Sequence, residues 1–196
     1  HISPSSILVI TFTKAAATEM KERFLRLMEQ SEEKPQGYGN VLFGTFHAVF
    51  FNILKLSYGF TAANILREET RYQYMKEIVD RLKLEIDDEN EFISGVLGEI
   101  SLIKNERISL EHYFSKNCAE DIFRKIFASY EQRKRNARLI DFDDMLSYTW
   151  ELLTKLPDIM EAWQKKFRYI LVDEFQDINR LQYDILRLLA QPENNL

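Results

Sequence analysis

Two adjacent carboxylates at the end of an apolar run are the strongest candidates for chemistry in this sequence. Asp173 and Glu174 directly follow Tyr169–Val172. Mg²⁺ prefers hard oxygen ligands, so Asp173 could hold this ion, while Glu174 could orient and deprotonate an attacking water in phosphoryl transfer. Gln176 both donates and accepts hydrogen bonds, which suits it to sense a terminal phosphate. A solvated turn at a strand end is the alternative interpretation of the Asp–Glu pair taken alone.

Hydroxyl groups follow two further apolar runs and could bind phosphate. Thr11 and Thr13 come after Ile7–Ile10, and Thr45 comes after Val41–Phe43. Threonine hydroxyls donate hydrogen bonds to phosphate oxygens, and the N–H groups that open a helix favour anions. These hydroxyls could contact a nucleic-acid backbone, and a plain helix cap is the alternative role of Thr13.

Two aromatic side chains accompany these threonines. Phe12 could stack on a base or pack into the core, and His47 could pack, donate to a phosphate or cap a helix. Stacking on aromatic rings tolerates any base sequence, so such a contact would carry no sequence preference. Both the nucleic-acid and the structural interpretation stay open for each residue.

The hydrophobic pattern indicates which elements hold these residues. Short continuous apolar runs are typical of strands buried on both faces of a parallel sheet, and they occur at Ile7–Thr11, Val41–Phe43 and Tyr169–Asp173. Residues from about 60 to 166 instead repeat apolar residues every three or four positions, which predicts an almost wholly helical segment. The predicted fold class is therefore α/β, with a parallel sheet interrupted by a large helical insertion.

An aspartate and two runs of basic residues precede the last predicted strand. Asp141 could cap a helix, and the residues on that helix expected to face the core are Phe142, Met145, Leu146, Thr149 and Leu153. Two basic runs could bind phosphate or form solvated helix faces, and they comprise Arg133, Lys134, Arg135 and Arg138, then Lys165, Lys166 and Arg168. Taken alone, each run is more typical of a solvated face.

Composition limits the classes of protein that this sequence can form. An apolar fraction of 45% in 196 residues supports a sizeable core and argues against disorder, while 6 glycines and 4 prolines argue against collagen-like or turn-dense all-β folds. A single cysteine, Cys118, excludes an internal disulfide framework and fits a reducing compartment. No apolar run is long enough for a membrane-spanning helix, and no secretory leader is visible. The net charge of −5 gives no overall nucleic-acid signal, so such contacts would depend on local groups.

Four segments in family order resemble motifs of known enzymes. Ile170–Asn179 resembles the Walker B segment, or motif II, of the UvrD/Rep/PcrA-like superfamily 1 DNA helicases. Thr11–Met20 is similar to their motif Ia, Gly44–Ala48 to their motif Ib, and Asp141–Leu146 to a further segment of the same family. The middle of the chain has the length and helical pattern of the family's inserted subdomain 1B.

The resemblance implies a fold and a division into subdomains. It implies a partial RecA-like parallel sheet of the P-loop NTPase type with a large all-helical insertion. Residues 1–47 and 167–196 would form subdomain 1A, and residues 48–166 would form the helical subdomain 1B. It also implies a cytoplasmic protein that moves 3′→5′ along DNA and has no membrane partner.

The resemblance also assigns roles to the candidate residues. ATP and Mg²⁺ would be the cofactors, with Asp173 holding the metal, Glu174 acting as general base and Gln176 coupling the γ-phosphate to DNA. The partner would be single-stranded or partly duplex DNA, and the residues implied to contact it are Thr11, Phe12, Thr13, Thr45 and His47.

The sequence departs from the family pattern at Lys14, at Ile178, where Thr is common, and in one larger respect. Lys14 stands where motif Ia often has Asn, so the DNA contact of that position is open. The chain also lacks G-x-x-x-x-G-K-[ST], the phosphate loop that precedes motif Ia in the family. We therefore expect a helicase fragment that needs the remainder of the protein, with the phosphate loop and the second RecA-like domain, to hydrolyse ATP.

Two other functions stay open at this point. The parent protein could be a helicase–nuclease of the AddA/RecB kind, which a nuclease domain after residue 196 would reveal. The chain could instead be a non-catalytic module that binds single-stranded DNA or another protein. A phosphate loop encoded before residue 1 would favour an ATPase parent, whereas a genuine start at residue 1 would favour the binding module.

Overall fold

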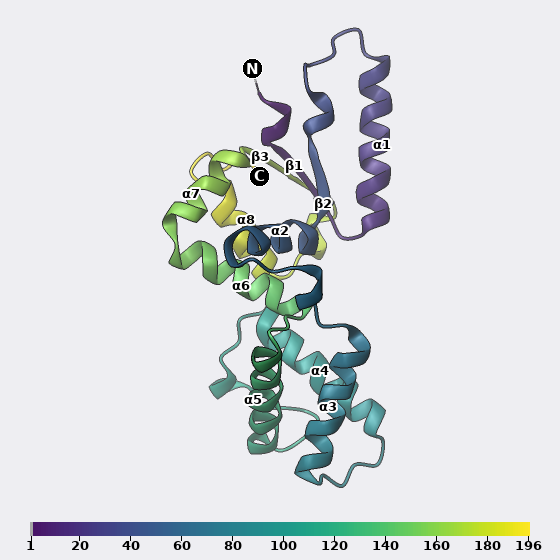
Figure 1. Ribbon diagram of the computed structural model, residues 1–196, viewed down its shortest axis with the longest axis vertical. Coiled ribbons are helices and arrows are strands. Elements are labelled where there is room, and N and C mark those ends of the chain that lie inside the picture. Colours follow the sequence, from purple (N-terminus) through teal and green to yellow (C-terminus); the bar gives the residue numbers. More distant parts are fainter. Residues whose placement is uncertain (1) are drawn as a thin grey trace. The chain divides into compact units, whose positions relative to one another are not determined.

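A small parallel sheet carries the predicted strands in the computed structural model, which describes residues 2–196 (Figure 1). Strand β1 (Ile7–Thr11) lies between β2 (Leu42–Thr45) and β3 (Tyr169–Val172), and both pairings are parallel. The predicted parallel sheet is confirmed. β2 begins one residue later than predicted and continues through Thr45, because a 3₁₀ turn, Tyr38–Asn40, precedes it and Val41 serves as the end of that turn.

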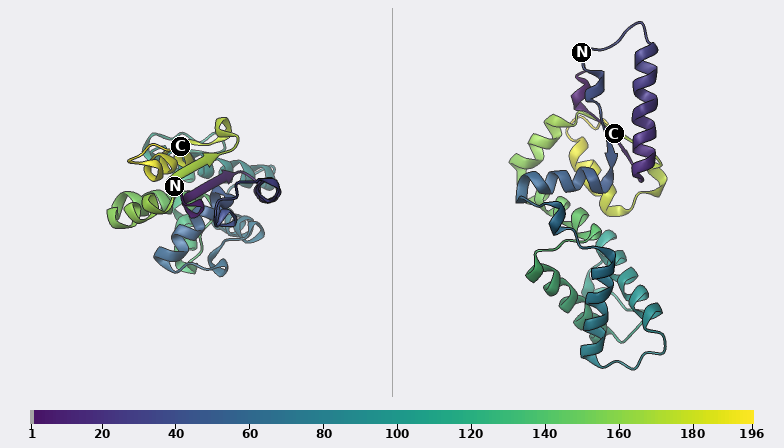
Figure 2. Two further views of the ribbon diagram at one scale, coloured as in Figure 1. Left: turned by 90° about the horizontal axis from the view of Figure 1, so that it is seen from above. Right: turned by 45° about the vertical axis from the view of Figure 1, so that its right-hand side comes forward.

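The chain divides into two compact units, and the sheet belongs to the unit made of residues up to 54 together with 148–196. We call this the sheet unit. Its helices are α1 (Lys14–Gln30), the first part of α2 (Phe46–Tyr58), the last part of α6 (Phe142–Lys155), α7 (Pro157–Lys166) and α8 (Arg180–Ala190). Both figures place α1 and α7 on opposite sides of the sheet (Figures 1 and 2). Fully buried residues of its core include Leu8, Ile10, Phe46, Phe50, Ile53, Leu153, Ile185 and Leu186.

Local sequence explains where the helices of the sheet unit begin. Thr13 caps α1, since its hydroxyl oxygen accepts a hydrogen bond from the N–H of Ala16 at 3.1 Å. Asn179 and Gln182 form a reciprocal capping box at the start of α8. Pro157 occupies the first position of α7, where its missing N–H costs no helical hydrogen bond.

The second unit, residues 55–147, is helical, and we call it the helical unit. It contains α3 (Glu68–Leu82), α4 (Glu89–Asn105) and α5 (Glu120–Ala137), with the end of α2 and the start of α6. Within residues 60–166 the structure contains no strand, and one isolated parallel bridge joins Ile65 to Ile140. The predicted helical segment is thus confirmed. Its core is built from Leu66, Met75, Ile78, Val79, Ile93, Val96, Leu97, Ile100, Ile103, Phe123, Ile126 and Tyr130.

One residue expected to face the core does not. On α6, Phe142 is 51% exposed, whereas the other members of the predicted stripe are buried. A helical side chain leans back over the turn that precedes it, and Phe142 is the first residue of its helix. Its ring therefore extends past the end of the packed helix surface.

No helix within residues 2–196 is long and apolar enough to cross a membrane.

Candidate functional site

The candidate residues gather at the carboxyl ends of the strands. The strand register places Thr11 beside Thr45 and Ile10 beside Val172. Asp173 follows Val172 directly, and its N–H donates to the carbonyl oxygen of Ile10 at 2.9 Å. Segments far apart in the sequence thus lie next to one another at one edge of the sheet, which is where parallel α/β sheets bind ligands.

Thr11 and Asp173 are joined directly at this edge. The hydroxyl of Thr11 donates to Oδ2 of Asp173 at 3.2 Å, and Thr11 is only 3% exposed. Asp173 is half-buried. Mg²⁺ is commonly held by one or two carboxylates together with phosphate and water, and ligating carboxylates are usually oriented by a further hydrogen bond. The donor set at Asp173 therefore fits this ion.

Glu174 adopts an unusual backbone conformation. Its φ of 52° and ψ of 46° lie in the left-handed region, which residues other than glycine rarely occupy. Strained positions of this kind cluster at functional sites. The 3₁₀ turn Phe175–Asp177 follows, and the side-chain amide of Gln176 donates to Oε2 of Glu174. The structure thus brings the predicted base and the predicted phosphate sensor together, both exposed to solvent.

A groove of about 590 Å³ connects the two other predicted segments. It lies between α1, the end of β2 and the start of α2, and its lining residues are Lys14, Ala17, Thr18, Lys21, Glu22, Leu25, Phe43, Gly44, Thr45 and Ala48. The hydroxyl of Thr18 donates to the carbonyl oxygen of Lys14 at 2.9 Å, and Glu22 adds one negative charge to the lining. Lys14 and Lys21 supply cationic donors and Thr45 a hydroxyl donor beside apolar side chains. This combination suits a phosphate backbone with its attached sugars and bases.

The threonines at this edge that remain partly accessible act as helix caps. Thr13 caps α1, and the hydroxyl oxygen of Thr45 accepts from the N–H of Ala48 at 3.2 Å in α2. A hydroxyl that accepts one bond keeps its own hydrogen to donate. The capping role and a phosphate contact are therefore compatible for both residues.

The two aromatic candidates lie close to these caps. Phe12 is 38% exposed, and its ring packs on Phe46 with ring centroids 5.3 Å apart. One part of the Phe12 ring is held by the protein while another part reaches solvent, which leaves surface for stacking. His47 is half-buried in the first turn of α2.

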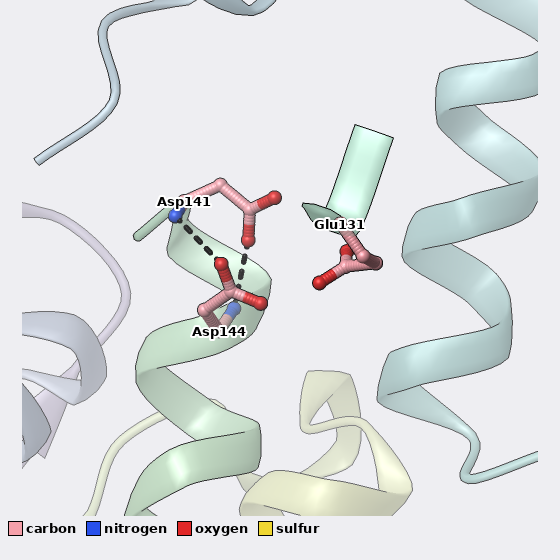
Figure 3. Close-up of side chains that lie close together, drawn as sticks. All are labelled: Glu131, Asp141 and Asp144. Carbon is pink, nitrogen blue, oxygen red and sulfur yellow. Dashed lines mark hydrogen bonds between the residues drawn. The ribbon is translucent and has the colours of Figure 1, made fainter. Parts of the chain in front are cut away.

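A second group of carboxylates lies in the helical unit, with Asp141 and Asp144 buried and Glu131 half-buried (Figure 3). Glu131, Asp141 and Asp144 place carboxylate oxygens within 4.8 Å of one another. Nζ of Lys134 lies 2.7 Å from Oδ2 of Asp141 and 2.6 Å from Oδ2 of Asp144. Nζ of Lys104 lies 2.6 Å from Oδ1 of Asp144 and 2.6 Å from Oε1 of Glu131. The two ammonium groups already bind the oxygens that a metal ion would need, so this donor set does not fit a metal. We call these five residues the ion cluster.

One oxygen of the ion cluster is compensated by charge alone. Oε1 of Glu131 is buried, and no hydrogen bond of good geometry reaches it. It nevertheless lies within ion-pair distance of Lys104 and, at 2.9 Å, of Lys134. We regard this oxygen as paired, because an ammonium at that distance stabilises a carboxylate whatever the angle of its N–H bonds.

Burial and charge oppose each other in the pKa values of the ion cluster. Burial acts to lower the pKa of Lys104, but the nearby Asp141 and Asp144 outweigh it and raise that pKa well above its ordinary value. Burial acts to raise the pKa of Asp141, but Lys104 and Lys134 outweigh it and lower that pKa. Burial raises the pKa of Asp144. Tyr130 donates to Oδ2 of Asp141 at 3.0 Å, and burial raises the pKa of its phenol.

The ion cluster corrects the interpretation of the basic run near residue 135. Lys134 is 1% exposed and is neither a solvated charge nor a phosphate ligand. Arg133 pairs with Glu77 and lies 4.0 Å from the ring centre of Tyr74. The sequence contained a sign that Lys134 is buried. Lys134 follows Tyr130 by four residues, so the two side chains lie on the same, apolar face of the helix.

The parallel sheet, the carboxylates at its edge and the helical insertion define a partial RecA-like α/β domain. A family model described as the UvrD/REP helicase N-terminal domain matches residues 1–196. The chain belongs to this family.

The relatives of this chain include longer bacterial proteins. YjcD of Bacillus subtilis is 36% identical over 198 aligned residues, which cover 100% of this chain and 25% of that protein. The ATP-dependent DNA helicases PcrA of Bacillus subtilis and Leuconostoc citreum are 33% and 32% identical, again over 100% of the chain and 26% of each helicase. The chain therefore spans about a quarter of the length of these relatives.

Proposed function

We propose that this chain is the part of an ATP-dependent DNA helicase that carries the hydrolytic carboxylates and one DNA-binding groove. The observation that carries the proposal is the shared sheet edge, where Thr11, Thr45 and Asp173 end or follow neighbouring strands. Nucleotide chemistry and DNA contact would thus take place on one rigid sheet. The names of the PcrA relatives, which are ATP-dependent DNA helicases, support it.

The nucleotide side would use three residues in separate roles. Asp173 would hold Mg²⁺ bound with ATP, and the bound ion would neutralise charge on the phosphate oxygens. Glu174 would orient the attacking water and take its proton. Gln176, hydrogen-bonded to Glu174, would respond to the γ-phosphate and link its presence to the base. Phosphoryl transfer depends on positioning, and the left-handed backbone at Glu174 supports such a role.

The DNA side would use the groove between α1 and the start of α2. Within the groove, Thr45 would contact a phosphate, and Lys14 and Lys21 would attract the backbone. Thr13, His47 and Phe12 lie within two residues of these lining residues in the sequence; Thr13 and His47 would contact phosphates and Phe12 would stack on a base. We propose single-stranded or partly duplex DNA as the partner, 3′→5′ movement along it and a cytoplasmic location.

Hydrolysis would need more than these residues. Phosphoryl transfer requires groups that cradle the phosphates and neutralise their charge, and Asp173 and Glu174 provide only a metal ligand and a base. We therefore propose that the 196-residue chain alone hydrolyses no measurable ATP. A non-catalytic DNA-binding module is the second candidate function, because the groove is formed by residues of this chain alone.

The decisive experiment replaces Glu174 in the full-length protein. Glu174→Gln should lower DNA-stimulated ATP hydrolysis by about 10²- to 10⁴-fold, the usual contribution of a general base. ATP binding should persist, because Asp173 is unchanged. Glu161→Gln, at an exposed position of α7, is the matched control and should keep normal turnover. Near-normal turnover in Glu174→Gln would overturn the assignment of the base.

A further inference from the structure

We propose that Thr11 is a positioning residue for Asp173, so that the segment beside the DNA groove and the metal-binding carboxylate are linked by one hydrogen bond. This inference rests on the proposed function of Asp173. It departs from the role that the sequence predicted for Thr11, which was a direct contact with DNA phosphate.

The burial of Thr11 is the first argument. With 3% of its surface exposed, the residue cannot present its hydroxyl to a phosphate in solvent without local opening of the strand end. A buried hydroxyl without a partner is costly, and the partner it has is Oδ2 of Asp173 at 3.2 Å. The hydroxyl is thus directed at the nucleotide side of the sheet edge.

The chemistry of this donor is the second argument. A carboxylate that ligates a metal is usually oriented by an outer hydrogen bond. Lysine in this place would neutralise the carboxylate, as Lys134 does for Asp141 in the ion cluster. Threonine fixes one oxygen of Asp173 but carries no charge, so the full negative charge stays available for a cation. The backbone of Asp173 is held as well, because its N–H donates a hydrogen bond to the carbonyl oxygen of Ile10.

The position of Thr11 in the chain is the third argument. Thr11 ends the central strand β1, and the next residue is Phe12, whose side chain is 38% exposed and which precedes the groove-lining Lys14 by two residues. A DNA contact that shifts the backbone of Phe12 would move Thr11 and, through its hydroxyl, the carboxylate of Asp173. DNA binding would in this way change the affinity for the metal–nucleotide complex, and by linkage the nucleotide would change the affinity for DNA.

The test compares Thr11→Val, which removes the hydroxyl but keeps the shape, with Thr11→Ser, which keeps the hydroxyl. Mn²⁺ would be titrated into the full-length protein in the presence of ADP and followed by electron paramagnetic resonance. Thr11→Val should weaken Mn²⁺ binding about tenfold, the lower end of the effect of losing an outer hydrogen bond to a metal ligand. Thr11→Ser should bind Mn²⁺ normally. The Mg²⁺ concentration that half-saturates ATP hydrolysis should rise in parallel.

Further measurements separate this inference from the proposed function. Asp173→Asn should abolish Mn²⁺ binding; if it does not, the proposed function itself fails. If Asp173→Asn is inactive but Thr11→Val binds Mn²⁺ normally, only the present inference fails. A loss of single-stranded DNA affinity in Thr11→Val without a change in Mn²⁺ binding would also overturn it. Thr154→Val, an exposed threonine of α6, is the control, and Thr11→Ala replaces Thr11→Val if thermal unfolding shows that the valine variant does not fold.

Discussion

Asp141 and Asp144 cap the first turn of α6 reciprocally: the N–H of Asp144 donates to Oδ1 of Asp141 at 2.8 Å, and the N–H of Asp141 donates to Oδ2 of Asp144 at 3.1 Å. This is a capping box in which aspartate replaces the usual glutamate. The same carboxylates also bind Lys104 and Lys134. One pair of side chains therefore caps the start of a helix and neutralises two buried ammonium groups.

Removing one cation of the ion cluster should strongly destabilise the helical unit. Lys134→Met leaves the three carboxylates of the ion cluster with one ammonium, that of Lys104, in place of two. Removing one partner from a buried ion pair costs about 3–5 kcal/mol. The measurement is urea unfolding of the 196-residue chain. Lys125→Met removes a lysine from an exposed pair with Asp121 and should change stability by less than about 0.5 kcal/mol. Equal effects of the two substitutions would contradict the buried network.

The ion cluster should also make the chain sensitive to alkaline pH. The pKa values of Lys104 and Tyr130 are raised from ordinary values of 10.5 and 10.0. The unfolded chain then releases these protons before the folded chain does, so stability is full below about pH 10 and falls as pH rises further, by up to about 1.4 kcal/mol per pH unit for each group. Urea unfolding between about pH 8 and 11.5 tests this. Tyr130→Phe should show a shallower decline; an unchanged slope would refute the contribution of Tyr130.

Two glycines of α4 should respond differently to alanine. Gly98 has no atom within 4 Å of an added Cβ, whereas a Cβ on Gly95 would clash with Oδ1 of Asn117. Gly98→Ala should therefore stabilise the chain by roughly 0.5–1 kcal/mol through helix propensity alone. Gly95→Ala should stabilise the chain less than Gly98→Ala does, because the side chain of Asn117 must move. The double variant Gly95→Ala with Asn117→Ala should recover the gain in thermal unfolding; failure to recover it would assign the cost to something other than this contact.

We predict that both the exposed ring of Phe12 and the charge of the groove contribute to DNA binding. In the full-length protein, Phe12→Ala should weaken binding of single-stranded DNA by roughly 1–3 kcal/mol, the value of one base–aromatic stack. Lys21→Gln should weaken binding and reduce the salt dependence of the affinity by about one charge. Filter binding at several salt concentrations measures both. Phe114→Ala, an exposed phenylalanine of the helical unit, is the control for Phe12. An affinity that does not change with salt would argue against phosphate contacts in the groove.

The sheet was predictable because strands and helices have different apolar periods. Ile7–Thr11 and Tyr169–Val172 were found from continuous apolar runs, and the carboxylates were found because Asp173 and Glu174 come at the end of one of them. Their proximity to Thr11 and Thr45 followed from parallel pairing, since all carboxyl ends meet at one edge of such a sheet.

Contacts that depend on tertiary packing were not predictable from the sequence. The hydrogen bond from Thr11 to Asp173 joins residues 162 positions apart, and hydroxyls after a strand also suit solvent or phosphate. Lys134 lies within a basic run, which predicts a solvent-exposed side chain. Its spacing of four residues from Tyr130 predicts instead that it lies on the buried face of the helix. Burial of such a lysine depends on carboxylates supplied by another helix, which the local pattern does not reveal.

The long connection from β2 to β3 has a consequence for folding during synthesis. β1 needs β3 to cover one of its edges, yet β3 leaves the ribosome only after the whole helical unit has been made. Contacts within that unit are more local than the β1–β3 pairing, and local contacts form sooner. During synthesis, the edge of β1 that later binds β3 therefore has unpaired backbone N–H and C=O groups. An exposed apolar strand edge of this kind can pair with other chains. Shielding of this edge by chaperones would matter most in the interval before Tyr169–Val172 emerge.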